Sequence, residues 1–95
     1  LYAATKAGVD LLIKSFAPQL PSGSRLNAIS PGIIEDARMT TVRTDLDVLA
    51  AKKKKTPTQV FCSSMEVAHL TYYLLFEAGN LTGENLNVNG GMYVS

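Results

Sequence analysis

Only two segments of this sequence have the pattern of β-strands, and helical segments precede both. Glu84–Asn89 alternates strictly between apolar and polar residues, as a strand with one buried face does. Arg25–Ser30 is the other short strand and comes first in the chain, and Pro31 and Gly32 are expected to stop it. This order of elements indicates an α/β sheet with parallel strands and crossover helices on its faces. Two strands are too few for a stable sheet of this kind, so we expect the fold to be incomplete on its own.

Three segments are predicted to be helical. Residues 2 to about 20 carry apolar side chains at the 3.6-residue period, and Pro18 is expected to kink or end the last turn. Thr44–Lys55 is a weaker candidate that ends in four consecutive lysines, which suit the negative end of a helix dipole. The clearest helix begins with a capping box at Ser63 and is expected to stop at Gly79.

Composition and charge exclude several classes of protein. A net charge of +1 gives no overall attraction to nucleic acid or to an anionic membrane. No apolar run approaches the roughly 18–20 residues of a membrane span, and no signal peptide is visible. Cys62 is the only cysteine and can form no internal disulfide, which fits a reducing compartment. We expect a cytoplasmic protein without nucleic-acid or membrane partners.

Four blocks of the sequence are informative because of their order and spacing. They are YAATKAG (residues 2–8), RLNAISPG (residues 25–32), EVA (residues 66–68) and LTGENLNVNGG (residues 81–91). Together they resemble the carboxyl-terminal part of a short-chain dehydrogenase/reductase, from the catalytic Y-x-x-x-K onward. The resemblance implies that residues 1–95 are part of a Rossmann-like NAD(P)-binding domain with a doubly wound parallel sheet. Its glycine-rich amino-terminal half is absent, as if the chain were cut just upstream of the tyrosine.

The resemblance assigns chemistry to Tyr2 and Lys6. A free phenol has a pKa of about 10 and is a poor base at neutral pH, but an ammonium one helical turn away favours its ionised form. Tyr2 would be the general acid/base in the interconversion of an alcohol and a ketone. Lys6 would favour the phenolate and hydrogen-bond the nicotinamide ribose. Taken without the other blocks, the pair is better interpreted as a tyrosine beside an unrelated surface lysine.

The turn after the first strand is expected to contact the cofactor, which is NAD or NADP. Pro31 ends the strand, and Gly32 permits close approach of the backbone to a flat ring. The resemblance implies that the backbone at Ile33 and Ile34 meets the nicotinamide carboxamide. The alternative is an ordinary turn at the end of a strand.

Asp36 departs from the family pattern, which often has a threonine a few residues after the Pro-Gly turn. An acidic side chain is unfavourable beside a diphosphate, so Thr40 or Thr41 could substitute, or the loop could be remodelled. The segment from Glu35 to Ser64 corresponds to the family's variable substrate-binding region. Its larger apolar side chains could line a pocket or belong to a local core: Met39, Val42, Leu46 and Phe61.

The lysine run Lys52–Lys55 is best interpreted as a solvated face, and docking of an acidic carrier or an anionic substrate is the sharper alternative. His69 has no second ligand at metal-binding spacing, so no metal site is expected. The resemblance implies a homo-oligomer, either a dimer or a tetramer, because in this family the two long helices build subunit contacts. Packing of these helices within a single chain is the alternative.

Two functions are consistent with these patterns. The first is a segment of an NAD(P)-dependent oxidoreductase that acts on a small-molecule alcohol or ketone by hydride transfer. The second is a non-catalytic remnant or oligomerisation module of the same fold. A third arrangement, in which another chain completes the strands, is also open. The substrate and the direction of the reaction have no recognisable motif.

Overall fold

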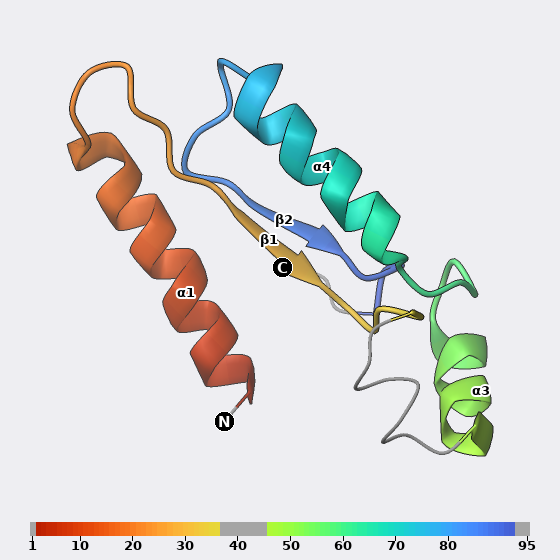
Figure 1. Ribbon diagram of the computed structural model, residues 1–95. Helices are drawn as coiled ribbons and strands as arrows, with labels where there is room; N and C mark the ends of the chain where they lie inside the picture. The colour runs from red at the N-terminus through yellow and green to blue at the C-terminus, as the bar shows by residue number, and fades with distance from the viewer. Residues whose placement is uncertain (1, 37–45, 93–95) are drawn as a thin grey trace.

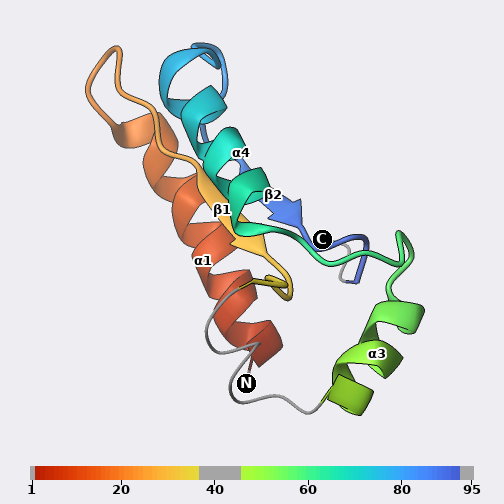
Figure 2. The same ribbon diagram turned by 45° about the vertical axis from the view of Figure 1, so that its right-hand side comes forward.

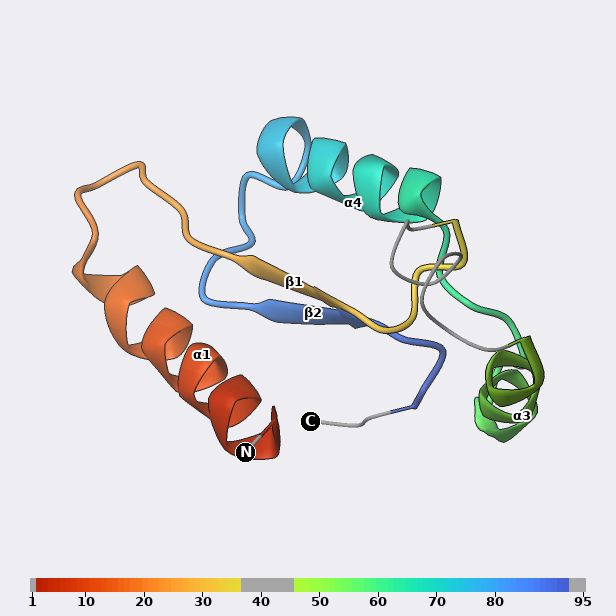
Figure 3. The same cartoon turned by 60° about the horizontal axis from the view of Figure 1, so that its bottom comes forward.

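The computed structural model of the chain describes residues 2–36 and 46–92. Two parallel strands lie between a helix on one side and a helix on the other, and a shorter helix stands at the end of the sheet (Figures 1 and 3). The elements in chain order are α1 (Tyr2–Phe16), the 3-10 helix η1 (Ala17–Gln19), β1 (Ala28–Pro31), α3 (Leu46–Lys55), α4 (Ser64–Phe76) and β2 (Asn85–Val88). This order confirms the predicted α/β class and the predicted sequence of helices and strands.

The two strands pair in parallel, as predicted. Their register aligns Ala28 with Asn85 and Pro31 with Val88. Parallel neighbours need a long crossover connection, because the chain must return to the same end of the sheet. Helices α3 and α4 lie in that connection, and α4 covers the sheet on the side opposite α1 (Figure 1).

Strand β1 begins later and ends later than predicted: it spans Ala28–Pro31 instead of Arg25–Ser30. The N–H of Gly32 donates to the carbonyl oxygen of Val88 at 2.9 Å. The backbone N–H groups of alternate residues in a strand point toward the same neighbouring strand. The backbone nitrogen of Pro31, which carries no hydrogen, therefore faces away from β2. The proline therefore removes no hydrogen bond between the two strands, which is why it can be the last strand residue.

The segments that precede β1 and β2 are hydrogen-bonded to each other. The Asn27 Nδ2 donates to the Leu81 carbonyl oxygen at 2.8 Å, and the Asn27 Oδ1 accepts from the Glu84 N–H at 3.1 Å. The Gly83 N–H donates to the Leu26 carbonyl oxygen at 2.7 Å. These polar groups are satisfied outside the regular ladder, which explains why the strand pattern does not extend to residue 25.

Helix α1 ends where proline was expected to disturb it. Pro18 lies at the start of η1, so the α-helix stops at Phe16 and the chain continues as one 3-10 turn. Helix α4 begins as predicted, because the Ser63 Oγ accepts from the Glu66 N–H at 3.1 Å.

The predicted stop of α4 at Gly79 is wrong. The helix ends at Phe76, and the N–H groups of Glu77 and Ala78 both donate to the carbonyl oxygen of Tyr73 at 2.9 Å. The glycines with a positive φ are at positions 23, 83, 90 and 91, so Gly79 does not supply the left-handed residue of a glycine stop.

Arg25, and not a glycine, caps the carboxyl-terminal end of α4. Its Nη1 donates to the carbonyl oxygens of Leu74 at 2.7 Å and Ala78 at 3.0 Å, and its Nη2 donates to that of Leu75 at 3.2 Å. The last carbonyls of a helix have no partner within the helix, and a cation there also opposes the negative end of the helix dipole. A side chain from before β1 thus caps α4.

The described chain buries a small core and leaves much apolar surface open. Its accessible surface is 6944 Å², whereas a folded monomer of 10.2 kDa exposes about 5300 Å². The buried apolar residues are Ile13, Ala17, Cys62, Leu74 and Ala78. The exposed large ones on α1 and α4 are Val9, Leu11, Leu12, Phe16, Met65, Tyr72, Tyr73, Leu75 and Phe76. Both long helices therefore present apolar faces that the described chain does not cover.

Within residues 2–36 and 46–92, no helix is both long enough and apolar enough to cross a bilayer.

Candidate functional site

A cleft of about 420 Å³ opens at the carboxyl end of β1. Ligands of open α/β sheets bind at this end of the strands, so the position alone makes the cleft a candidate site. Its lining residues are Pro31, Gly32, Ile33, Lys52, Lys55, Thr56 and Met92. Three of the residues predicted to bind the cofactor, Pro31, Gly32 and Ile33, are thus brought together here.

Gly32 is required by a contact within the protein. A Cβ at this position would lie 2.9 Å from the Cβ of Asn89 and 3.0 Å from its Cα. The segments that follow β1 and β2 therefore pass too close for any side chain at residue 32. The predicted approach of Gly32 to a flat ring is a separate contact and stays a prediction.

Ile34 does not line the cleft. It forms an isolated parallel bridge with Cys62, and the Glu35 N–H donates to the Cys62 carbonyl oxygen at 2.8 Å. Burial, and then the negative charge of Glu66, raises the pKa of the Cys62 thiol. The thiol is therefore a protonated packing group. The predicted contact of Ile34 with a carboxamide stays a prediction.

Gly90 and Gly91, which follow β2, contact the turn that follows α3. Gly90 and Gly91 have φ values of 65° and 88°, which favour glycine. A Cβ on Gly90 would meet Thr56 Cγ2 at 2.6 Å, and one on Gly91 would meet Pro57 Cγ at 3.0 Å. The Thr58 N–H donates to the Gly90 carbonyl oxygen at 3.1 Å. The turn after α3 is thereby held against the end of β2.

Thr56 joins this turn to the last turn of α3 by hydrogen bonds. Its side chain is 2% exposed, and its hydroxyl donates to the carbonyl oxygen of Lys52 at 2.9 Å. Its N–H lies 3.1 Å from the same oxygen and 3.2 Å from that of Lys53. The last turn of α3 is therefore fixed beside the cleft, although α3 has no buried residue of its own.

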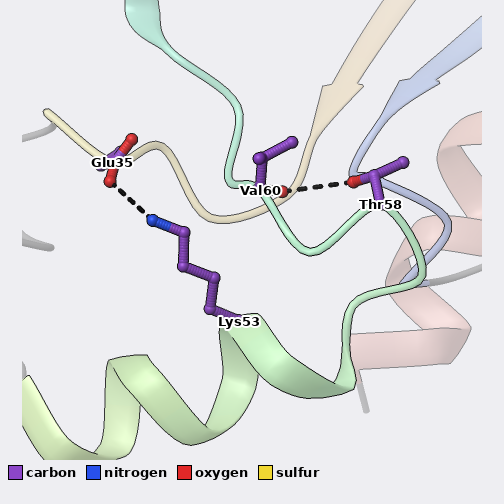
Figure 4. Close-up of polar contacts among 4 residues, drawn as sticks. All are labelled: Glu35, Lys53, Thr58 and Val60. Atoms are coloured by element: carbon purple, nitrogen blue, oxygen red, sulfur yellow. Dashed lines mark hydrogen bonds and ion pairs between the residues drawn. The ribbon is translucent and has the colours of Figure 1, made fainter.

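The lysine run is divided between two environments. Lys53 pairs with Glu35 at 3.0 Å (Figure 4), and its ammonium lies 5.5 Å from the centre of the Phe61 ring. Figure 4 also shows the bond of 3.4 Å from the Thr58 hydroxyl to the Val60 carbonyl oxygen, in the loop that follows α3. Lys52 and Lys55 line the cleft. Lys52, Lys54 and Lys55 are exposed, as the interpretation of the run as a solvated face predicts, and Lys53 is half-buried.

Asp36 has a structural partner at the start of α4. Its Oδ1 accepts from the Ser64 N–H at 2.9 Å, and its Oδ2 accepts a short hydrogen bond from the Ser64 hydroxyl. These bonds, the hydroxyl first, lower the pKa of the Asp36 carboxyl. A carboxylate at a helix N-terminus is also favoured by the helix dipole. The departure at Asp36 is thus explained by helix capping. Thr40 and Thr41, the proposed substitutes, lie outside the described residues.

The predicted catalytic pair lies in the first two turns of α1. Tyr2 is the first residue of the helix, and its side chain lies outside what the structure describes. Lys6 follows one turn later and is half-buried. The amino-terminal end of α1 lies at the same end of the sheet as the carboxyl end of β1 (Figures 1 and 2). The helical spacing is as expected, and the catalytic roles stay predictions.

The other predicted residues are not brought together. Met39 and Val42 lie outside the described residues, Leu46 is 81% exposed, and Phe61 lines a different cleft of about 360 Å³ beside Cys62. His69 is exposed on α4. Within the described ranges, no three His, Cys, Asp or Glu side chains are grouped so that they could hold a metal ion. The residues missed by sequence reasoning, Thr56 and Met92, become part of the site through the turn against the diglycine.

Known proteins are similar to this chain over nearly its whole length. The profile of a family described as enoyl-(acyl carrier protein) reductase matches residues 1–93. The chain is 41% identical over 95 residues to the 3-oxoacyl-[acyl-carrier-protein] reductase FabG of Vibrio harveyi. The alignment covers 98% of this chain and 38% of that protein. The chain is 39% identical over 94 residues to the FabG of Aquifex aeolicus, covering 97% of this chain and 37% of the relative.

A solved structure shares the fold. The crystal structure of a 3-oxoacyl-[acyl-carrier protein] reductase from Brucella melitensis superposes with a TM-score of 0.86 at 33% identity. The match covers 99% of this chain and 35% of that one. The chain spans 37–38% of the length of the curated relatives described above.

Proposed function

The chain belongs to the short-chain dehydrogenase/reductase family, and from that premise we propose that it is part of an NAD(P)-dependent oxidoreductase that interconverts an alcohol and a ketone. The names of the relatives, 3-oxoacyl-[acyl-carrier-protein] reductases, indicate the ketone of a 3-oxoacyl thioester as the substrate. The observation that carries the proposal is the position of Tyr2 and Lys6. They occupy successive turns at the end of α1 that lies toward the cleft end of the sheet (Figure 2).

The lining of the cleft fits the nicotinamide end of a dinucleotide. Pro31, Ile33 and Met92 offer apolar surface for a flat ring, and Gly32 adds no side chain there. These residues, with Lys6 on the ribose hydroxyls, would hold the cofactor, which can be NAD or NADP. When bound, the nicotinamide supplies or accepts the hydride.

The protein's own part in the reaction is the movement of a proton. Reduction leaves negative charge on the carbonyl oxygen, and the Tyr2 phenol would donate its proton to that oxygen. In the reverse direction, the phenolate would remove the proton from the alcohol. Lys6 would stabilise the phenolate, because an opposite charge favours the ionised form.

Replacement of Tyr2 in the complete protein tests the proposal. Tyr2→Phe should lower kcat for reduction of an acetoacetyl thioester with NADPH or NADH by about 10²–10⁴-fold, the range for general acid–base catalysis. Tyr72→Phe is the matched control, since Tyr72 is exposed on α4 and keeps its ring contact with Phe76 at 4.9 Å. Unchanged turnover in Tyr2→Phe rejects the assignment.

A non-catalytic oligomerisation module is the second candidate, and the apolar faces of α1 and α4 favour it. Leu11 and Phe76 are 66% and 70% exposed, and a second copy of the chain could cover both helices as a dimer or a tetramer. Such a module predicts association in sedimentation without binding of NADPH in calorimetry. A homo-oligomer is compatible with the catalytic proposal as well, and so is a cytoplasmic location.

A further inference from the structure

We propose that Lys53 is a positioning residue, whose ammonium holds α3 against the segment that follows β1. Helix α3 and the residue after it supply Lys52, Lys55 and Thr56 to the lining of the cleft at the end of β1. Lys53 therefore keeps one wall of that cleft in place. The part of the inference that concerns a ligand rests on the proposed function, because the ligand would be the nicotinamide cofactor. The part that concerns the position of α3 is independent of it.

Helix α3 is covered along a narrow stripe. None of its residues is buried, and Leu46 and Val48 are 81% and 46% exposed. The half-buried side chains are Leu49 and Lys53, and the buried Thr56 follows them at the same helical period. A lysine thus lies in the middle of the covered stripe, where an amphipathic helix normally carries an apolar residue.

The Lys53 ammonium contacts two segments outside α3. It lies 3.0 Å from the Glu35 Oε1, and Figure 4 shows the side chain reaching from α3 to that carboxylate, which follows β1. It also lies 5.5 Å from the centre of the Phe61 ring, within the range of a cation–π interaction. Lys53 thereby joins α3 to the segment after β1 and to the segment before α4.

A separate contact fixes the carboxyl-terminal end of α3. Thr56 lies so close to Gly90 that a Cβ on this glycine would meet the Thr56 Cγ2 at 2.6 Å. One anchor at the end of a helix fixes that end but leaves the helix axis free to pivot. The contacts of Lys53, one turn earlier, add a second point and so fix the direction of the axis. Lys52 and Lys55 are held at the cleft by this direction.

The contacts of Lys53 are partly open to water, so their effect should be small but measurable. The side chains of Lys53 and Glu35 are 39% and 58% exposed. A helix of ten residues is marginal in water by itself, and a helix with no buried residue belongs to the least stable parts of a fold. Loss of the ammonium should therefore raise the fraction of molecules with a detached α3 about fivefold.

Hydrogen exchange of the complete protein without ligand measures this fraction. Lys53→Met keeps a long side chain and removes its charge, and the amides of residues 46–55 should then exchange about fivefold faster. Lys53→Arg should restore the wild-type rate, because a guanidinium can pair with Glu35 and stack on Phe61. Raising the salt concentration to about 1 M should speed this exchange in the wild-type protein and have little effect in Lys53→Met.

Lys54→Met is the matched control. Lys54 is the next residue of the helix, is exposed and is not part of the cleft lining, so its replacement should leave the exchange of α3 unchanged. Equal effects of Lys54→Met and Lys53→Met overturn the inference, and so does a failure of Lys53→Arg to restore the rate. Exchange that rises equally in β1, β2 and α4 also overturns it, because the change would then be a general loss of stability.

Binding of NADPH tests the role of α3 at the cleft. In Lys53→Met the Kd for NADPH should rise about two- to fivefold, because the ligand binds the form with α3 attached. The kcat should stay within about twofold, since Tyr2 and Lys6 lie on α1. Faster exchange with an unchanged Kd overturns the role at the cleft. If the wild-type protein does not bind NADPH, the proposed function fails, and exchange without ligand still decides whether Lys53 holds α3.

Discussion

The Nη1 of Arg25 lies 2.7 Å from the carbonyl oxygen of Leu74, 49 residues later in the chain. This bond joins the segment before β1 to the last turn of α4, so it fixes the helix against the sheet at the end opposite the cleft. The same guanidinium also reaches Leu75 and Ala78. A planar group with several donors suits such a cluster of carbonyls better than a lysine ammonium.

Removal of this cap should destabilise the fold. We expect Arg25→Ala to lower the free energy of unfolding of the complete protein by about 2 kcal/mol, because the carbonyl oxygens at the end of α4, most of them part-buried, lose charge-assisted bonds. Arg25→Lys should recover only part of the loss. Urea denaturation measures both, and Lys14→Ala is the control, since its pair with Asp10 at 3.1 Å is a surface i,i+4 contact worth about 0.3–0.5 kcal/mol. Equal losses at Arg25 and Lys14 contradict the capping role.

Asp36 should make stability depend on pH at the acidic end. Its pKa is lowered in the folded protein below the usual 3.8, so its contribution is fully present above that value and is lost as the pH falls through the folded pKa. Asp36→Asn should reduce the urea midpoint at neutral pH and flatten its decline in acid.

The partner of Asp36 supplies the control for this prediction. Ser64→Ala removes the hydroxyl donor and should produce a similar loss at neutral pH. If the two groups act through their mutual bond, the double variant should lose less than the sum of the single changes. Additive losses, or an unchanged acid profile in Asp36→Asn, would show that the carboxylate acts elsewhere.

Local patterns predicted the parts of the fold that depend on neighbouring residues. The start of α4 follows from Ser63 and Glu66, which are three positions apart, and β2 follows from the alternation in residues 84–89. The end of α4 depends instead on Arg25, whose acceptors lie about 50 residues away. No local pattern contains that contact, and Gly79 was the most reasonable stop signal in its absence.

The candidate site divides in the same way. Pro31 and Gly32 were identified because a strand that meets Pro-Gly has a local signature. The position of the last turn of α3, which carries Lys52 and Lys55, is set by the contact of the turn at Thr56 with Gly90, 34 residues later. The lysines themselves are visible in the sequence, but their assignment to the cleft requires that tertiary contact.

Gly32 should tolerate no side chain. We expect Gly32→Ala to cost about 1–3 kcal/mol in the free energy of unfolding, the usual range for overpacking, because its Cβ would lie 2.9 Å from that of Asn89. Gly8→Ala is the contrasting control: a Cβ there meets nothing within 4 Å, and alanine in a helix is favoured over glycine by about 1 kcal/mol. Thermal or urea unfolding of the complete protein measures both signs. A neutral Gly32→Ala would mean that the segments after β1 and β2 are farther apart.

Lys6 should affect activity through charge. In the complete protein, Lys6→Met keeps a long apolar side chain but removes the ammonium, and we expect kcat/KM to fall about 10²-fold or more. The acidic limb of alcohol oxidation should also move to higher pH, because the phenolate of Tyr2, which would be the base in this direction, would lose its stabilising charge. Lys14→Met removes a charge two turns farther along the same helix, where Lys14 pairs with Asp10, and should leave both quantities unchanged. If Lys6→Met lowers kcat/KM without moving the pH profile, Lys6 contacts a ligand and does not influence the phenol.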